Sequence, residues 1–257
     1  MGTREHGRGS QMGCRGLFEK STRWENIPMT IGKLYGIGVG PGDPELVTMK
    51  AVRLLAQADI VAVPDKGTGE KTALGIVQAY VEGKELLLCP TPMTRDQAVL
   101  DECHDRIARQ LCSLLDQGKT VCFITLGDPS IYSTYIYVHK RVQAAGYPAE
   151  LIPGVPSFCA VAARLGISLC EQDQRLLILP AGGEDPIGEQ FPANKVYMKA
   201  GSGIMELQQR LAAQGKLDRA SAVENCTMAD ERVWSRFGDM QTPSGYFSVV
   251  VVKEDQA

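Results

Sequence analysis

The first half of the chain alternates short apolar runs with segments in which apolar residues recur at helical spacing. Apolar runs typical of buried strands lie at residues 33–40, 59–64, 85–90, 120–130 and 148–158. Helical spacing predicts helices over 71–81 and 96–117, and a further helix with Asp43 as its N-cap and Pro44 in its first turn. Apolar strands separated by helices are typical of a parallel sheet that is covered on both faces. The pattern therefore predicts an α/β domain over residues 32–150.

The pattern changes after residue 150. A short helix is predicted over 157–166, and 203–215 is the one clear helical period beyond it. Short strand candidates fill much of the remainder, at residues 175–180, 195–200, 219–225, 232–237 and 246–253. Strands that outnumber helices in this way predict an α+β domain with a mixed sheet over residues 151–257.

Residues 1–28 differ from the rest of the chain. They show neither core periodicity nor the apolar stretch of a secretory signal, and Met29 directly precedes the first strand-like run. We expect this segment to be a disordered leader or tag that folding does not need.

Composition narrows the classes of function. The 257 residues carry a net charge of −3, which gives no support for a nucleic-acid partner, and no apolar run approaches the roughly 18 residues of a membrane span. The 8 cysteines form no CxxC pair, which indicates reduced thiols and argues against a metal cluster. We therefore expect a cytoplasmic protein that binds no metal, nucleic acid or membrane.

A glycine-rich turn at residues 36–42 follows the first predicted strand. Such turns often bind anions or nucleotides, because small residues let the backbone approach the ligand. The dinucleotide pattern requires glycine where Pro41 or Asp43 stands, and the Gly-Lys-Ser/Thr ending of a phosphate loop is missing. Asp43 and Glu45 also place negative charge where a phosphate would bind. The turn thus favours a neutral or cationic ligand, such as the sulfonium S-adenosylmethionine, or serves only as a tight turn.

Two further turns, the acidic "LGDPSIYSTY" (126–135) and "PGVPSF" (153–158), lie at strand ends, where open α/β sheets bind ligands. With "GVGPGDPELVT" (38–48), "VYMK" (196–199) and "AVENCT" (222–227), their order resembles the tetrapyrrole (corrin and porphyrin) methyltransferase family over residues 32–253. Within that family, "TPMTRD" (91–96), "GDPSIYSTYIYV" and "CEQDQRLLILPA" look most like the members that methylate carbon 20 of precorrin-2, or of its cobalt form, in cobalamin (vitamin B12) synthesis.

The resemblance implies two α/β domains with S-adenosylmethionine in the cleft between them, a homodimer, and an open trough for the tetrapyrrole. The cofactor contacts of the family, many of them made by backbone groups, carry over to Pro41, Gly127, Asp128, Ile131, Ser133, Thr134, Pro156, Ser157, Met198 and Asn225. Many relatives have threonine at the position of Pro156, so a side-chain contact there is not expected.

Methyl transfer is an in-line displacement, and a reduced tetrapyrrole is already an electron-rich nucleophile. The protein chiefly needs to hold the two reactants in contact, which agrees with the lack of a Ser-His-Asp or Cys-His set. Asp65, Tyr132 and Tyr135 are candidates for assisting loss of the proton from carbon 20, with core packing as the alternative for the tyrosines. Cations that would meet the carboxylates of the substrate, unless they are merely solvated surface charges, are Lys66, Lys71, Arg95, Lys140 and Arg141.

Other functions stay open at this point. The alternatives are methylation of a different ring carbon, non-catalytic tetrapyrrole binding on the same scaffold, and a nucleotide-dependent oxidoreductase. Ribosomal-RNA and diphthine methyltransferases share the scaffold, although the charge balance and residues 91–96 argue mildly against them. The sequence leaves open whether the substrate carries cobalt.

Overall fold

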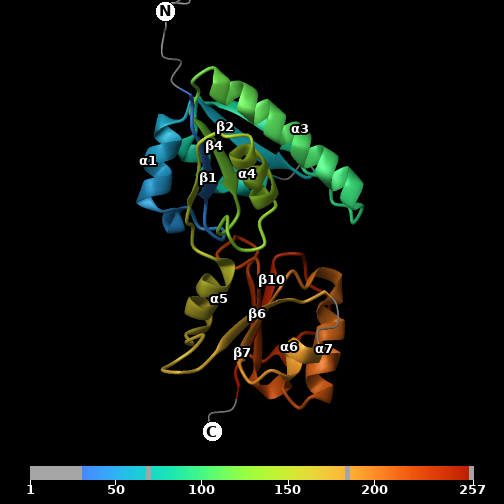
Figure 1. Cartoon of the computed structure of the whole chain (residues 1–257). Helices are drawn as coiled ribbons and strands as arrows, with labels where there is room; N and C mark the ends of the chain where they lie inside the picture. Colours follow the sequence, from blue (N-terminus) through green and yellow to red (C-terminus); the bar gives the residue numbers. More distant parts are fainter. Residues whose placement is uncertain (1–30, 68–70, 183–185, 255–257) are drawn as a thin grey trace, which may run out of the picture.

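The strand-like runs of the first half form one parallel sheet. The computed structural model describes residues 31–67, 71–182 and 186–254, so the predicted leader at 1–28 lies outside the described residues. The strands of this sheet are β1 (Leu34–Gly38), β2 (Ile60–Asp65), β3 (Glu85–Pro90), β4 (Val121–Thr125) and β5 (Ala149–Ile152). They are ordered β3-β2-β4-β1-β5, and every pairing is parallel. Figure 1 shows this sheet in its upper half, where β1, β2 and β4 are labelled.

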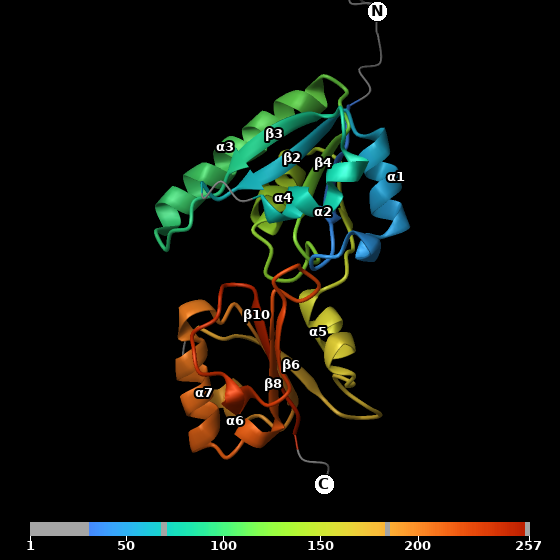
Figure 2. The same cartoon turned by 180° about the vertical axis from the view of Figure 1, so that it is seen from behind.

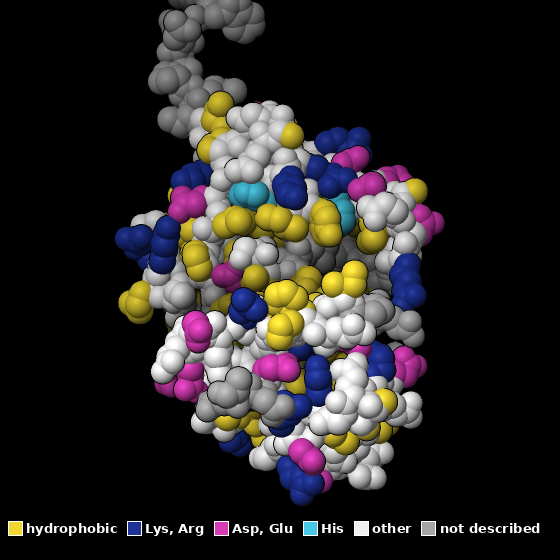
Figure 3. Space-filling model, turned by 60° about the horizontal axis from the view of Figure 1, so that its bottom comes forward, with side chains coloured by type: hydrophobic (Ala, Val, Ile, Leu, Met, Phe, Trp, Pro, Cys, Tyr) yellow, Lys and Arg dark blue, Asp and Glu magenta, His cyan; other side chains and the backbone are white. Residues whose placement is uncertain are grey.

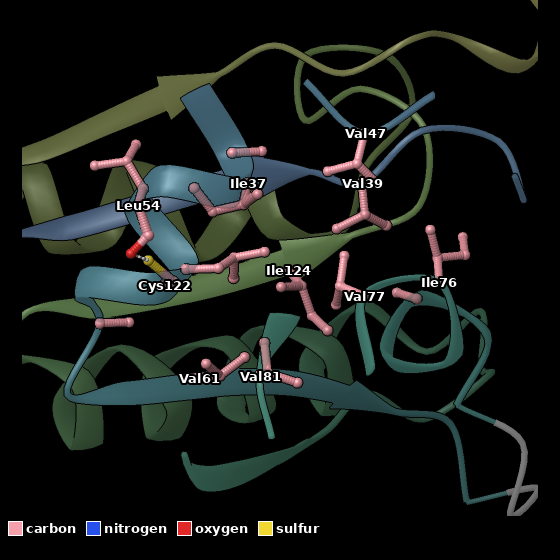
Figure 4. Close-up of a cluster of buried hydrophobic side chains, with 14 of the residues drawn as sticks. Ile37, Val39, Val47, Leu54, Val61, Ile76, Val77, Val81, Cys122 and Ile124 are labelled. Atoms are coloured by element: carbon pink, nitrogen blue, oxygen red, sulfur yellow. Dashed lines mark hydrogen bonds between the residues drawn. The ribbon is translucent and has the colours of Figure 1, made fainter. Parts of the chain in front are cut away.

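Helices cover both faces of this sheet, which explains why its strands are apolar without alternation. The helices α1 (Met49–Gln57) and α2 (Thr72–Val77) pack on one face, and α3 (Gln97–Asp116) and α4 (Tyr135–Ala144) pack on the other (Figure 2). Figure 4 shows the core under α1 and α2, where the thiol of Cys122 donates to the carbonyl oxygen of Leu54 over 3.5 Å.

The predicted start of the first helix is wrong by several residues. The side chain of Asp43 does cap a turn, but that turn is the 3₁₀ helix η1 (Pro44–Leu46). Val47 and Thr48 are then extended, and the Thr48 hydroxyl accepts a hydrogen bond from the Ala51 amide at 3.2 Å to begin α1. An Asp-Pro pair favours the first turn of either helix type, so the pattern did not separate them.

The second half forms a separate sheet. Its strands are β6 (Leu176–Pro180), β7 (Asn194–Met198), β8 (Ala220–Glu224), β9 (Arg232–Trp234) and β10 (Ser248–Val252), in the order β6-β7-β10-β8-β9. Only β6 and β7 pair in parallel, so the prediction of a mixed sheet is confirmed. The predicted strand at 232–237 ends earlier, because Phe237 opens the 3₁₀ helix η5 (Phe237–Asp239).

Helices also cover the second sheet. The helix α5 (Ser157–Leu165) packs on one face, whereas α7 (Ile204–Ala213) packs on the other, with the short α6 (Pro186–Gln190) on the same side as α7 (Figure 1). Short 3₁₀ turns complete the elements: η2 (Gln78–Tyr80), η3 (Gly201–Gly203) and η4 (Leu217–Arg219). The predicted fold class, a parallel sheet followed by a mixed sheet, is confirmed, while the limits of independently folding domains stay a prediction.

Among the described residues, no helix is both long enough and apolar enough to cross a membrane. The described cysteines are free thiols. Cys159 is exposed, although its neighbours in the sequence are apolar.

Candidate active site

The glycines in and just after β1 are required by close approach of other protein segments. A Cβ atom on Gly36 would lie 1.9 Å from a ring carbon of Tyr135, and one on Gly38 would lie 2.6 Å from the amide nitrogen of Gly154. Gly40 forms an isolated bridge with Gly127, in which the Gly127 amide donates to the Gly40 carbonyl over 2.7 Å. The glycine-rich turn therefore packs β1 tightly against the loops after β4 and β5.

The acidic residues of this turn do not face a ligand site. Asp43 accepts a hydrogen bond from the Glu45 amide at 2.8 Å, and its own amide donates to the Thr227 hydroxyl at 3.0 Å. Neither Asp43 nor Glu45 lines the cavity described below, whereas their neighbour Pro41 does. The argument that their negative charge selects the ligand is therefore wrong.

A cavity of about 410 Å³ lies at the carboxyl ends of the parallel strands. Each strand of the first sheet leads into it: Pro41 follows β1, Lys66 follows β2, Thr91 follows β3, Gly127 follows β4 and Pro156 follows β5. The second sheet contributes Met198 at the end of β7, Lys199 after it, Cys226 after β8, and Tyr246 and Phe247 before β10. The cavity thus lies between the two sheets, at the edge where α/β sheets bind ligands.

Hydrophobic side chains gather where the two halves of the molecule meet. Figure 3 shows them as a band across the middle of this face, with Lys and Arg side chains beside it and a hollow in the surface. The cavity is mainly hydrophobic, like this band. Its lining residues include Pro41, Ile131, Met198, Tyr246 and Phe247. Mostly apolar walls with a few polar groups are typical of small-molecule sites.

The structure brings together every predicted cofactor-binding residue except one. Those that line the cavity are Pro41, Gly127, Asp128, Ile131, Ser133, Thr134, Pro156, Ser157 and Met198. Asn225 is not among the lining residues, and its side-chain amide donates to Asp230 Oδ2 over 2.6 Å. Asn225 has a φ of 50°, so it serves the turn after β8 rather than the cavity wall.

Asp128 clamps two loops at the cavity. Its Oδ1 accepts hydrogen bonds from the amide and the hydroxyl of Ser130, and its Oδ2 accepts one from the Gly154 amide at 3.0 Å. The carboxylate therefore joins the turn after β4 to the turn after β5. Both oxygens are used within the protein, so Asp128 shapes the cavity more than it offers charge to a ligand.

Polar groups remain for a ligand at the start of α4, where Thr134 is the N-cap residue, and at the start of α5. Neither helix is capped by its N-cap side chain, and the hydroxyls of Thr134 and Ser157 form no hydrogen bond with other described residues. The first amides of a helix have no partner within the helix, so uncapped amides favour an anionic or accepting group. Ser133 is different, because its hydroxyl is 2.9 Å from that of Thr125 and accepts from the Tyr135 amide.

The three candidates for proton removal lie in different environments. Tyr135 is 1% exposed, its hydroxyl is 3.0 Å from Nδ1 of His139, and burial raises its pKa. Tyr132 lines the cavity and donates to the Ile178 carbonyl at 3.2 Å, and burial raises its pKa too. Asp65 does not line the cavity, and it accepts from the Gly67 amide at 2.9 Å. Tyr135 is thus a core residue that also lines the cavity, and its burial favours core packing, the alternative interpretation.

The predicted substrate cations separate into two groups. Lys66 and Lys71 line the cavity, whereas the exposed Arg95 and Lys140 do not. Arg141 is also outside the lining set, and its guanidinium forms ion pairs with Asp101 at 2.7 Å and Asp105 at 2.5 Å. The prediction for Arg141 is corrected, because these ion pairs tie α4 to α3.

Sequence reasoning missed Lys199 and Tyr246 as lining residues. Lys199 stands in the motif "VYMK", in which only Met198 had been singled out. No signal around Tyr246 could have placed it there, because it reaches the cavity through the pairing of β10 in the second sheet. With Lys66 and Lys71, Lys199 gives the cavity three ammonium groups, and Asp128 is the one carboxylate among the described lining residues.

Thiol and metal chemistry find little support in the described part of the chain. Burial raises the pKa of Cys226, which lines the cavity, to about 12, so its thiol is a poor nucleophile. The described residues hold no group of three or more His, Cys, Asp or Glu side chains placed to bind a metal ion.

The fold and the position of the cavity agree with those of one known protein family. The chain belongs to the Tetrapyrrole (Corrin/Porphyrin) Methylases, because the model of that family matches residues 33–240. Solved structures agree on the fold. The chain superimposes with a TM-score of 0.64 on a cobalt precorrin-4 methyltransferase of cobalamin biosynthesis, at 20% identity, covering 86% of this chain and 94% of that one. A uroporphyrin-III C-methyltransferase of Thermus thermophilus, complexed with S-adenosylhomocysteine, gives a TM-score of 0.62 at 21% identity, covering 86% and 97%.

Curated relatives are similar over almost their whole length. The cobalt-precorrin-2 C(20)-methyltransferase of Salmonella typhimurium is 33% identical over 230 residues, which cover 87% of this chain and 97% of that protein. The precorrin-2 C(20)-methyltransferase of a Sinorhizobium species is 32% identical over 234 residues, which cover 86% and 95%.

Proposed function

We propose that this protein transfers a methyl group from S-adenosylmethionine to carbon 20 of precorrin-2, or of its cobalt form, in cobalamin biosynthesis. The observation that carries the proposal is full-length similarity to two precorrin-2 C(20)-methyltransferases, together with one cavity that collects the motifs shared with the family. One of these relatives is named for cobalt-precorrin-2 and the other for precorrin-2. The experiment below decides which of the two forms is the substrate.

The residues present fit S-adenosylmethionine. Its adenine needs apolar walls, which Pro41, Ile131 and Met198 provide, and its hydroxyl and carboxylate groups need polar partners. Thr134, Ser157 and the uncapped start of α5 offer such partners. The Gly127 amide donates to Gly40, and the Gly127 carbonyl, which accepts from the Gly40 amide, keeps a second lone pair for a donor of the ligand.

When bound, S-adenosylmethionine supplies an electrophilic methyl group on a sulfonium. The chain itself has to hold that ligand and a flat, carboxylate-rich substrate in contact, an effect worth on the order of 7 kcal/mol or more of the barrier. The apolar lining excludes water, and Lys66 and Lys71 offer charges to the substrate carboxylates. The hydrogen bonds of Asp128 hold the turns after β4 and β5 together, so that both ligands bind to a fixed surface.

None of the three residues predicted to assist loss of the proton from carbon 20 is assigned that role in this proposal. Asp65 lies outside the cavity lining and Tyr135 is buried against His139. Tyr132 keeps its proton at neutral pH, because burial raises its pKa and its hydroxyl donates to Ile178. We assign Tyr132 to the cavity wall.

We further propose a cytoplasmic homodimer. The edge strand β3 supports the dimer, because Leu86 and Leu88 are 43% and 45% exposed on it. Free thiols in the described part of the chain support the cytoplasm. Light scattering coupled to gel filtration tests the dimer, and a monomer at micromolar concentration would contradict it.

The function is tested by incubating the protein with S-adenosylmethionine and precorrin-2, with and without cobalt, and weighing the product. The expected result is a gain of one methyl group on one of the two substrates. Binding of the pigment, seen in its absorption spectrum, with no methyl transfer would instead favour a non-catalytic tetrapyrrole-binding protein.

A further inference from the structure

At the cavity, two lysine side chains each extend from one half of the molecule to the other. Lys66 follows β2 in the first sheet, and its Nζ lies 4.8 Å from the ring centroid of Tyr246 and 5.1 Å from that of Phe247, just before β10. Lys199 follows β7 in the second sheet, and its Nζ lies 5.2 Å from the ring centroid of Tyr132, between β4 and α4. Each lysine therefore reaches an aromatic ring of the opposite half.

Lys66 and Lys199 both line the cavity. Burial and, after it, the charge of Lys66 lower the pKa of Lys199, and no carboxylate of the described residues offsets this effect. Asp128 is the one carboxylate among the described lining residues, and its oxygens are bonded to Ser130 and Gly154. Two ammonium groups at one cavity favour the binding of an anion there.

The backbone fixes one of these pairs in an unusual conformation. Lys199 has a φ of 59° and Tyr132 has a φ of 48°, which is the left-handed region that residues with side chains rarely occupy. Such conformations persist where the surrounding structure holds them, and they gather at ligand sites. Lys199 and Tyr132 thus both have left-handed backbone conformations at the cavity that they line.

We propose that Lys66 and Lys199 together bind one carboxylate of the tetrapyrrole substrate, so that the bound substrate joins the two halves. The inference rests on the proposed function, which supplies the substrate class. A charge-assisted hydrogen bond to a carboxylate is stronger than an exposed contact between an ammonium and a ring, so the carboxylate prevails over the aromatic partners. S-adenosylmethionine also carries a carboxylate, and the experiment separates these two sources.

The first arm of the experiment measures kcat and KM for precorrin-2. The variants are Lys66→Met, Lys199→Met, the double variant and Lys199→Arg, and the exposed Arg109→Met on α3 is the control. Each methionine variant should raise KM about tenfold or more with kcat nearly unchanged, since each loses a charge-assisted bond. The double variant should raise KM by less than the product of the single effects, because both lysines hold the same group. Lys199→Arg should restore most of the affinity, because arginine keeps the charge.

The second arm measures binding without catalysis. Uroporphyrin, a stable tetrapyrrole with carboxylate side chains, is titrated by its fluorescence, and S-adenosylhomocysteine is titrated by calorimetry. Lys199→Met should weaken uroporphyrin binding and leave S-adenosylhomocysteine binding unchanged. The opposite pattern would assign the lysines to the cofactor and overturn the proposal.

Two kinetic outcomes would also overturn it. Multiplicative effects of Lys66→Met and Lys199→Met would mean separate sites. A fall in kcat at constant KM that Lys199→Arg does not restore would make Lys199 a proton acceptor instead. If the unmodified protein transfers no methyl group, the proposed function fails, and the uroporphyrin titration still decides the lysine pair.

Discussion

Substitution of Asp128 by asparagine tests how the cavity is held together. The carboxylate accepts from Ser130 on one side and from the Gly154 amide, at 3.0 Å, on the other. An asparagine has one oxygen, so whichever way it turns, its NH2 group faces an N–H donor. The variant loses at least one charge-assisted hydrogen bond, worth about 1.5 to 3 kcal/mol. For a chain of this size, that corresponds to a melting temperature lower by roughly 3 to 12 °C.

The assay pairs a thermal melt with a calorimetric titration of S-adenosylhomocysteine on the same sample of Asp128→Asn. Affinity should fall together with stability, because the turns after β4 and β5 separate when the clamp is lost. Asp43→Asn is the matched control, since Asp43 caps η1 through one oxygen that asparagine retains, and it does not line the cavity. An unchanged melting temperature in Asp128→Asn, or an equal shift in Asp43→Asn, would refute the clamp.

Two further predictions concern the first sheet. Gly36→Ala should destabilise the fold by about 1 to 3 kcal/mol, since the new Cβ would lie 1.9 Å from the Tyr135 ring, and urea denaturation with an unchanged midpoint would disprove this. Burial lowers the pKa of His104 and His139 in the folded state, and the charge of Arg141 lowers that of His104 further. Stability should therefore fall as the pH drops below about 6.5, the usual histidine pKa. The unfolded chain then binds the protons first, so melting temperatures between pH 7.5 and 5.5 should decline, and by less in a double His→Gln variant. Equal declines in both proteins would contradict the assignment to these histidines.

The strands of the first sheet could be predicted from the sequence, because strands buried on both faces contain few polar residues. The run at 59–64 became β2 (Ile60–Asp65) almost residue for residue, since its apolar side chains meet helices on either side. The start of α1 was not readable, because an Asp-Pro pair can begin either an α or a 3₁₀ turn. The hydrogen bond from the Asp43 amide to Thr227, which joins this turn to a residue far along the chain, has no local signal either.

The site was readable only where its residues stand in local motifs. Strand-end position placed the turns at 126–135 and 153–158 near a ligand, and the family resemblance then singled out Gly127 and Pro156, which line the cavity. Charge alone misled, because an arginine on a helix looks the same whether it faces a ligand or, like Arg141, pairs with aspartates of another helix. The contact between Lys199 and Tyr132 joins the two sheets, and no local pattern encodes it.

The central claim is methylation at one carbon of a tetrapyrrole, and isotope labelling tests it most directly. S-adenosylmethionine with a ¹³C-labelled methyl group is incubated with the protein and with precorrin-2 or its cobalt form, and the product is examined by NMR. The account predicts a single labelled methyl group bonded to carbon 20. A labelled methyl group on any other ring carbon, or no labelled product from either substrate, would contradict it.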